Sequence, residues 1–200
     1  MGKLITFDPD THTYTLDGKP CPSVTEITRF LHYKAEYADR ESRDRAARKG
    51  TAIHELTALI DYGEDVEIPP ELSGYVQAWQ NYKRDYRVEI LAIEQMVGNY
   101  VAGLYGLCGI LDRRARIEDK IGIIDIKTGS TVNKVALQGQ LTGYDVLDTA
   151  HVNDFLLGVY LHADGTYTVY CAPRNFELLI SLYGLHKAEQ EAKNRWKITV

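Results

Sequence analysis

The sequence predicts an α/β fold in which a mixed β-sheet is flanked by helices and an N-terminal β-hairpin opens the chain. Two observations predict it. The middle of the chain reads helix, strand, strand, strand, helix, strand, and short apolar runs separated by Asp-Pro-Asp and Asp-Gly turns precede it. The 200 residues, 44% hydrophobic and 26% charged, suit one compact domain with a substantial core. No segment approaches the ~20 apolar residues of a membrane span, so no membrane association is expected.

Local patterns justify the elements in chain order. Alternating apolar runs and turns over 1–22 are typical of a hairpin. Ser23 followed by Glu26 forms a capping box, which predicts a short helix over 24–34. The remaining helices are predicted from stretches without proline or with helical spacing of apolar residues, and the remaining strands from short apolar runs. These are helices over 36–60, 73–87, 133–149 and 173–196, strands over 88–97, 107–117 and 121–128, and a hairpin over 155–172.

Charge and cysteine content narrow the class of protein. A net charge of −5 argues against a protein coated with positive charge for nucleic acid, although it leaves room for a local basic track. The three cysteines are scattered without CxxC spacing, so neither a disulfide framework nor a zinc site is expected. The N-terminus lacks the apolar core of a signal peptide, which favours a reducing cytoplasm.

The stretch GILDRRARIEDKIGIIDIKTGS carries the main functional signal. If Ile117 and Lys120 close a two-residue turn, Asp112 faces Asp125 across an antiparallel pair and Lys127 shares that face. Opposed carboxylates destabilise a sheet unless a cation lies between them, and oxygen ligands suit Mg²⁺ or Mn²⁺. A slip of one residue would separate the carboxylates. The alternative is a surface hairpin whose acids pair with the neighbouring arginines and with Lys127.

The helix over 36–60 offers a second set of candidates. His54 lies one turn after Thr51, and Arg43 and Arg40 continue the same stripe toward the start of the helix. Small residues flanked by cations allow close approach of a phosphate backbone. A packed or surface histidine, and a solvated helix with internal ion pairs, are the alternatives.

Three further polar residues occupy positions next to the hairpin. Glu94 lies inside an apolar run, so we expect a buried carboxylate that meets a cation or a metal-bound water. Gln140 and Tyr144 are four residues apart and share one helix face. They are expected either to hold a nucleotide strand or to cap an edge of the core.

Several motifs in order resemble the PD-(D/E)XK nuclease superfamily, in the branch of RecB-type nuclease domains, Cas4-like proteins and phage exonucleases. They are PSVTEI, GTAIHEL, Glu94, GILD, IIDIKTG and QLTGY, and they span roughly residues 20 to 160. The resemblance implies a restriction-endonuclease-like fold in a single domain, 1–200. Within it, 1–22 is the N-terminal hairpin, 36–162 the catalytic core and 173–196 the C-terminal helix.

The resemblance also implies a metal-dependent DNase with Mg²⁺ or Mn²⁺ as cofactor. Its expected metal ligands are His54, Asp112, Asp125 and the backbone carbonyl of Ile126. Lys127 is expected to orient the attacking water, Glu94 to be an accessory acid, and Gln140 and Tyr144 to touch substrate. Arg40, Arg43 and Thr51 are the additional expected contacts to DNA.

One departure from the family qualifies these expectations. Family members that carry an iron-sulfur cluster have four cysteines and this chain has three, so no cluster is expected. The small size and the PSVTEI lead-in resemble a phage or prophage recombination nuclease. Such an enzyme would work in the bacterial host cytoplasm, with a single-strand annealing or other recombination protein as partner. An exonuclease is the preferred reading, with a structure-specific endonuclease or a non-catalytic DNA-binding protein as alternatives.

Overall fold

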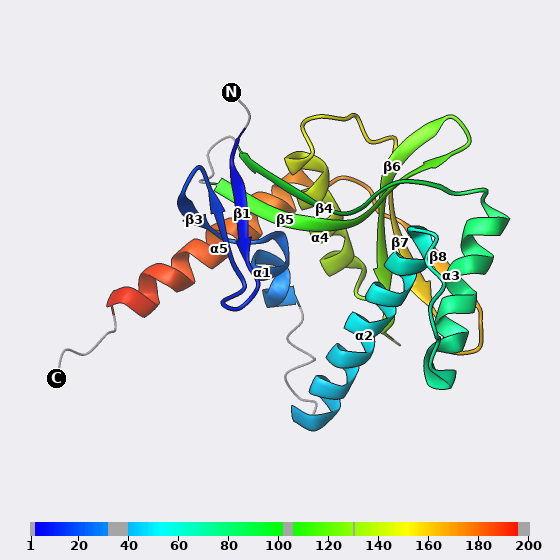
Figure 1. Ribbon diagram of the computed structural model, residues 1–200. Coiled ribbons are helices and arrows are strands. Elements are labelled where there is room, and N and C mark those ends of the chain that lie inside the picture. The colour runs from blue at the N-terminus through cyan, green and yellow to red at the C-terminus, as the bar shows by residue number, and fades with distance from the viewer. Residues whose placement is uncertain (1–2, 32–39, 102–105, 130, 196–200) are drawn as a thin grey trace.

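A computed structural model describes residues 3–31, 40–101, 106–129 and 131–195 (Figure 1). The end of the helix expected over 24–34 and the start of the one over 36–60 lie outside the described residues. The helices are α1 (Val24–Thr28), α2 (Arg40–Asp61), α3 (Ser73–Asp85), α4 (Lys134–Leu147) and α5 (Phe176–Arg195), with a 3₁₀ turn η2 (Pro70–Leu72). The strands are β1 (Ile5–Asp8), β2 (Thr13–Leu16), β3 (Lys19–Cys21), β4 (Glu89–Tyr100), β5 (Gly106–Ile117), β6 (Lys120–Lys127), β7 (Phe155–Leu161) and β8 (Tyr167–Cys171).

The central sheet is mixed, as the sequence predicts. Its strand order is β4-β5-β6-β7-β8. Strands β4, β5 and β6 pair antiparallel, β6 and β7 pair parallel, and β7 and β8 form an antiparallel hairpin. Helix α4 is the crossover that a parallel pair requires. The N-terminal hairpin is also confirmed, and the short β3 extends it to a three-stranded sheet, the N-terminal sheet (β1–β3).

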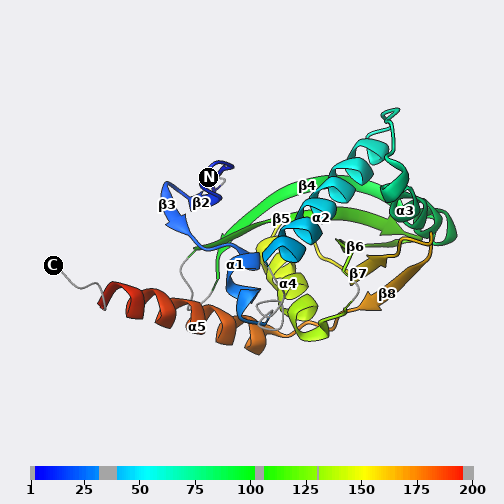
Figure 2. The ribbon, with the colours of Figure 1, turned by 90° about the horizontal axis from the view of Figure 1, so that it is seen from below.

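Helices cover both faces of the central sheet (Figures 1 and 2). One hydrophobic cluster, the α4 cluster, packs side chains of α1, α4 and α5 against the sheet. The other, the α3 cluster, packs α2 and α3 against the opposite face, with Trp79 and Tyr82 at its centre. Ile124 and Ile126 belong to the α3 cluster and are fully buried, as the alternation along the strand predicts.

Local chemistry explains where key elements begin and meet. Ser23 is the N-cap of α1 and its side chain accepts a hydrogen bond from the Glu26 backbone at 3.0 Å. Gly74 of α3 packs against the β7–β8 turn, where a Cβ would lie 1.7 Å from the Ala163 carbonyl oxygen. In the described part of the chain, no helix combines the length and apolarity needed to cross a membrane.

Candidate active site

Strand β5 exchanges its two faces at Asp112. Leu107 and Leu111 pack into the α4 cluster, whereas Ala115 packs into the α3 cluster and Arg113 bonds to α2. Strict alternation would place all four of these side chains on one face. The strand therefore reverses at Asp112, and the residue stands where the two sides of the sheet meet.

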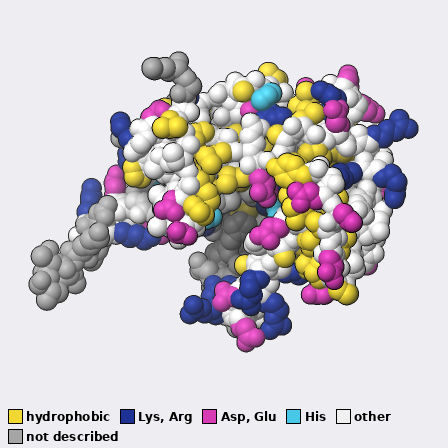
Figure 3. All heavy atoms as spheres, in the orientation of Figure 1, with side chains coloured by type: hydrophobic (Ala, Val, Ile, Leu, Met, Phe, Trp, Pro, Cys, Tyr) yellow, Lys and Arg dark blue, Asp and Glu magenta, His cyan; other side chains and the backbone are white. Residues whose placement is uncertain are grey.

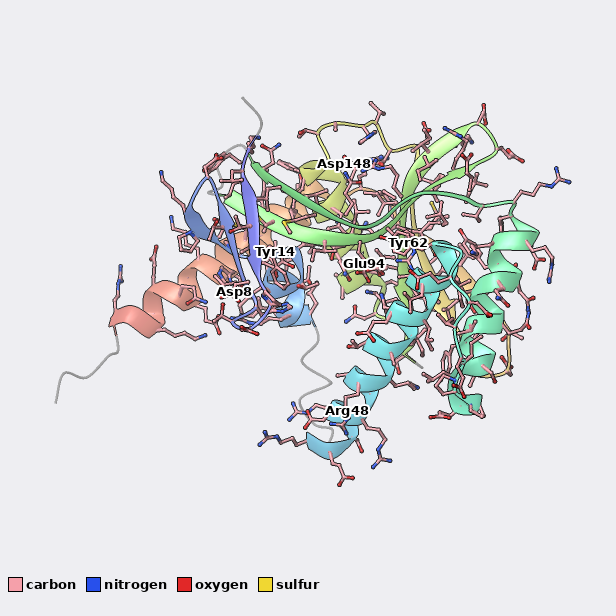
Figure 4. All side chains as sticks on the ribbon, in the orientation of Figure 1. Asp8, Tyr14, Arg48, Tyr62, Glu94 and Asp148 are labelled. Atoms are coloured by element: carbon pink, nitrogen blue, oxygen red, sulfur yellow. The ribbon has the colours of Figure 1, made fainter. Side chains whose placement is uncertain are left out.

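The neighbouring strand carries an irregularity at the same level. Glu94 of β4 has φ 48°, in the left-handed region, and lies between the pairs Ile93–Arg113 and Gln95–Leu111. Such backbone is costly for a residue with a side chain and is concentrated near functional sites. Glu94 is exposed, so the prediction of a buried carboxylate is wrong. In Figure 4 it appears between Tyr14 of the N-terminal sheet and Tyr62 beyond the end of α2.

The hairpin has the register that a two-residue turn dictates. Ile117 pairs with Lys120, and the ladder runs without a slip to the pair Arg113–Ile124. Extending it by one position sets Asp112 opposite Asp125. Beyond the ladder, the Asp112 carboxylate takes the place of a backbone acceptor, because its Oδ2 receives the Ile126 N–H at 2.8 Å.

The arginines of the hairpin do not neutralise these acids. Arg113 pairs with Asp61, Arg114 with Asp148, and Arg116 with Glu89. Lys127, the other cation of the surface-hairpin alternative, does pair with a hairpin acid: its Nζ is 2.6 Å from Asp125 Oδ2.

A buried polar network holds Asp125 and Lys127 against α4. Gln140 Nε2 donates to Asp125 Oδ1 at 3.0 Å, while Lys127 Nζ donates to Gln140 Oε1 at 3.0 Å. The Gln140 amide also donates to the Tyr144 hydroxyl at 3.2 Å. Both α4 residues are buried, Tyr144 with 3% of its surface exposed. The structure thus places them behind the Asp125–Lys127 pair, where they fix its position, and not on an open surface.

The electrostatics of this network raise the pKa of both Lys127 and Asp125, which favours the charged form of the lysine and disfavours the charged form of the carboxylate. Burial raises the pKa of Asp125 to about 6, and the nearby Asp112 adds to the rise, while Lys127 and His54 oppose it. Burial lowers the pKa of Lys127, but attraction to Asp125 and Asp112 outweighs it and the pKa is raised. Burial also raises the pKa of Tyr144 well above its usual value. At neutral pH Lys127 is a cation and Tyr144 is neutral.

His54 lies beside this group on α2. Its Nδ1 is 3.5 Å from Asp112 Oδ2, and 28% of its side chain is exposed. A Cβ on Gly50 would lie 3.5 Å from the Thr128 side-chain oxygen, so α2 passes close to the end of β6. The structure brings His54, Asp112, Asp125 and Lys127 together from α2, β5 and β6.

The donor set fits a partly hydrated hard cation. Asp125 Oδ2 is buried and receives no hydrogen bond of good geometry from the described residues, despite its contact with Lys127. No group of three or more His, Cys, Asp or Glu side chains in the described ranges could hold a metal ion. A closed protein cage is therefore absent from this part of the chain. Mg²⁺ is commonly bound by one or two carboxylates and several waters, which Asp112, Asp125 and the Ile126 carbonyl could supply.

The basic residues of α2 lie farther from the acids. The first turns of α2 project from the body of the protein, where basic and acidic side chains intermingle (Figures 1 and 3), and Figure 4 shows Arg48 at this end. Arg40 is 90% exposed and pairs with Asp44 at 3.8 Å, while Arg43 and Thr51 are also exposed. The helix thus contains an internal ion pair, as the solvated-helix alternative predicts, and it also exposes Arg43 and Thr51 to solvent.

Sequence reasoning missed one buried network. Arg113 and Asp61 are both fully buried and 2.7 Å apart. Arg113 also donates to the Thr57 hydroxyl at 3.2 Å and to the Asp112 backbone carbonyl at 2.8 Å. The network joins α2, which carries His54, to the backbone of Asp112. The signal for this network in the sequence was the position of Arg113, a charged residue inside a strand.

Comparisons with known proteins find similarity in structure but none in sequence families. No protein-family model matches the chain, and no curated protein sequence matches it. Among solved structures, the protein SSO0001 is similar with 18% identity and a TM-score of 0.49, over 84% of this chain and 75% of that one. An alkaline exonuclease from Laribacter hongkongensis, LHK-Exo, is similar with 15% identity and a TM-score of 0.46, over 87% and 89% of the two chains. The same exonuclease in complex with dAMP gives 15% identity and 0.45 over the same shares. Similarity at this level transfers no residue role to this chain.

Proposed function

We propose that the protein is a nuclease that hydrolyses DNA phosphodiester bonds with the help of Mg²⁺ or Mn²⁺. The observation that carries the proposal is the arrangement of the buried Asp125, whose carboxylate pairs with Lys127 and lies near the carboxylate of Asp112. The ordered motifs shared with PD-(D/E)XK nucleases support it. A pure DNA-binding protein has no use for clustered acids, since they repel phosphate.

The chemistry assigns a task to each residue. Phosphodiester hydrolysis needs a water nucleophile at neutral pH and stabilisation of the charge that develops on the phosphate. Asp112, Asp125 and the Ile126 carbonyl would hold the divalent ion, which would lower the pKa of a bound water. Lys127 presents a fixed positive charge where the phosphate becomes more negative and orients the water. Its ammonium is aimed by two acceptors, Asp125 and Gln140.

Supporting residues fix this geometry. Tyr144 holds the Gln140 amide, and Gln140 in turn holds both Asp125 and Lys127. His54 is proposed as an additional metal ligand beside Asp112. Glu94 is exposed on β4, between the residues that pair with Arg113 and Leu111, which suits an accessory acid that acts through water.

DNA is proposed to reach the site along α2. Thr51 and Arg43 are exposed on the helix that carries His54, and Arg40 continues toward its projecting end. Phosphate contacts of this kind position a strand without reading its sequence. Charge reversal at Arg43 should weaken DNA binding and its salt dependence, while metal binding stays as in the wild type.

The finer proposal is an exonuclease of phage or prophage recombination that works with a single-strand annealing or other recombination protein. The motif resemblance supports it. A structure-specific endonuclease is the alternative, and closed circular DNA separates the two, because an exonuclease has no end to start from. Cleavage of closed circles would contradict the exonuclease proposal and leave the nuclease proposal standing.

The decisive assay uses end-labelled single- and double-stranded DNA with Mg²⁺, with Mn²⁺ and with EDTA. Cleavage is expected with either metal, and it should disappear with EDTA and in Asp125→Ala. Asp119→Ala is the matched control, because Asp119 lies exposed in the turn of the same hairpin. Metal-dependent cleavage that survives in Asp125→Ala, or no cleavage under any condition, would refute the proposed function.

A further inference from the structure

Two cysteines far apart in the sequence meet between the N-terminal sheet and the central sheet. Cys21 ends β3, and Cys108 lies in β5 on the strand that leads to Asp112. Their Sγ atoms are 2.9 Å apart, with a sequence separation of 87. A disulfide needs about 2.05 Å between sulfurs, so the thiols are within about 1 Å of bonding distance.

The backbone holds the two thiols together. The Cys108 N–H donates to the Pro22 carbonyl at 3.1 Å, and Ser23 forms a parallel bridge with Cys108. Cys108 pairs with Gly98 on β4, where a Cβ would lie 2.9 Å from the Cys108 sulfur. Glycine at this position leaves the volume that the thiol occupies. The contact is therefore fixed by both sheets and not by a chance side-chain rotation.

The two thiols differ in their access to solvent. Cys108 is fully buried, whereas Cys21 is half-buried and lines a cavity of about 620 Å³ between the N-terminal sheet, α1 and α5. Glu26 and the buried His186 line the same cavity. Cys21 is therefore partly accessible from the cavity, whereas Cys108 is closed to solvent.

The thiols also differ in acidity. The hydrogen bond with Cys108 lowers the pKa of Cys21, while the same hydrogen bond and burial raise the pKa of Cys108. Reactive cysteines that sense oxidants are accessible, form thiolates readily and lie next to a second, resolving cysteine.

We propose that Cys21 and Cys108 form a reversible disulfide when the protein meets a peroxide, with Cys21 as the attacked thiol and Cys108 as the resolving one. The Cys21 thiolate attacks the peroxide oxygen, the O–O bond breaks, and a sulfenic acid and hydroxide form. The Cys108 sulfur then displaces hydroxide from the Cys21 sulfur, the S–S bond forms, and the Cys108 proton leaves with that oxygen as water. Two thiols are oxidised and one hydrogen peroxide is reduced to two waters.

The bond would tie the N-terminal sheet to the strand that carries Asp112. Cross-linking positions 87 residues apart removes freedom from the unfolded chain, which raises the stability of the folded protein. This inference stands apart from the proposed nuclease activity, because it concerns the thiols and can be measured on protein that never meets DNA.

The test treats reduced, full-length protein with hydrogen peroxide and counts free thiols by alkylation and intact mass. The count should fall from three to one with a loss of two hydrogens. Proteolytic mapping should place the bond between Cys21 and Cys108, dithiothreitol should reverse it, and the oxidised protein should have a higher Tm. In Cys108→Ser, dimedone should trap a sulfenic acid on Cys21.

Cys171 provides an internal control, because it is exposed on β8, away from the pair. Cys171→Ser should form the bond as the wild type does. The proposal is overturned if oxidation consumes Cys171 first while Cys21 and Cys108 both remain open to alkylation. It is also overturned if the bond appears only after unfolding in urea, or if the cross-link lowers the Tm. The wild-type measurements need no variant, so a folding defect in a mutant leaves the test intact.

Discussion

The buried carboxylate of Asp125 should weaken the metal-free protein at neutral pH, and Asp125→Asn should relieve that cost. Its pKa rises from an ordinary value near 4 to about 6. Each unit corresponds to about 1.4 kcal/mol, so the ionised side chain costs the fold about 3 kcal/mol. That figure already contains the attraction of Lys127. With a side chain that is 1% exposed, solvent screening reduces it little.

The sign of the pH dependence follows from the raised pKa. Protonated Asp125 stabilises the folded state fully below about pH 4, and this stabilisation is lost as the pH rises through about 6. Asparagine imitates the protonated form at every pH. The variant should therefore match the wild type near pH 4 and exceed it by about 3 kcal/mol at pH 7.5, or roughly 6–12 °C in Tm for a chain of this size.

Urea unfolding with EDTA at both pH values measures the effect, with Asp119→Asn as the control on the exposed turn of the hairpin. Addition of Mg²⁺ should raise the stability of the wild type and leave the variant unchanged, because bound ligand stabilises the native state. The reasoning fails if Asp125→Asn is less stable than the wild type at pH 7.5. That result would show that the loss of the ion pair with Lys127 costs more stability than the removal of the buried charge on Asp125 restores.

Three further changes test the fold around the site. Asp61→Asn should cost about 3–5 kcal/mol in urea unfolding, because the buried Arg113 loses its carboxylate partner; a cost below about 1 kcal/mol would contradict this. Burial raises the pKa of Asp148, but hydrogen bonds from neighbouring side chains outweigh it and lower the pKa. Asp148 therefore stabilises the fold above about pH 4, and Asp148→Asn should flatten the loss of Tm as the pH falls below about 4. Gly74→Ala should lower stability by at least about 1–3 kcal/mol, since its Cβ would lie 1.7 Å from the Ala163 carbonyl oxygen; an unchanged Tm would refute the close packing.

Local rules made much of the fold predictable. The side chain of Ser23 caps α1 as its spacing from Glu26 predicts, and the pair Ile117–Lys120 fixes the register of the whole acidic hairpin. Once the turn is set, the period of two in a strand leaves no freedom in which residues face one another. The ladder follows that register as far as the pair Arg113–Ile124, one position short of the predicted pair Asp112–Asp125.

Contacts between distant segments were beyond these rules. The apolar neighbours of Glu94 indicated burial, but its strand is at the edge of the sheet and its backbone turns to φ 48°. The surface-hairpin alternative pairs Arg113 with the hairpin acids, whereas Arg113 pairs with Asp61, 52 residues earlier, on α2. Their spacing predicts that Gln140 and Tyr144 share one face of α4, but only the packing of the whole chain shows that this face points inward.

The exchange of faces at Asp112 has a consequence for the cooperativity of the molecule. A single strand contributes to both hydrophobic clusters, and the acid stands at the crossing point between them. Opening either layer of helices would remove one wall around the carboxylates, so the proposed cation site would exist only while both layers are assembled. A fragment that keeps one cluster alone would be expected to lose the proposed site.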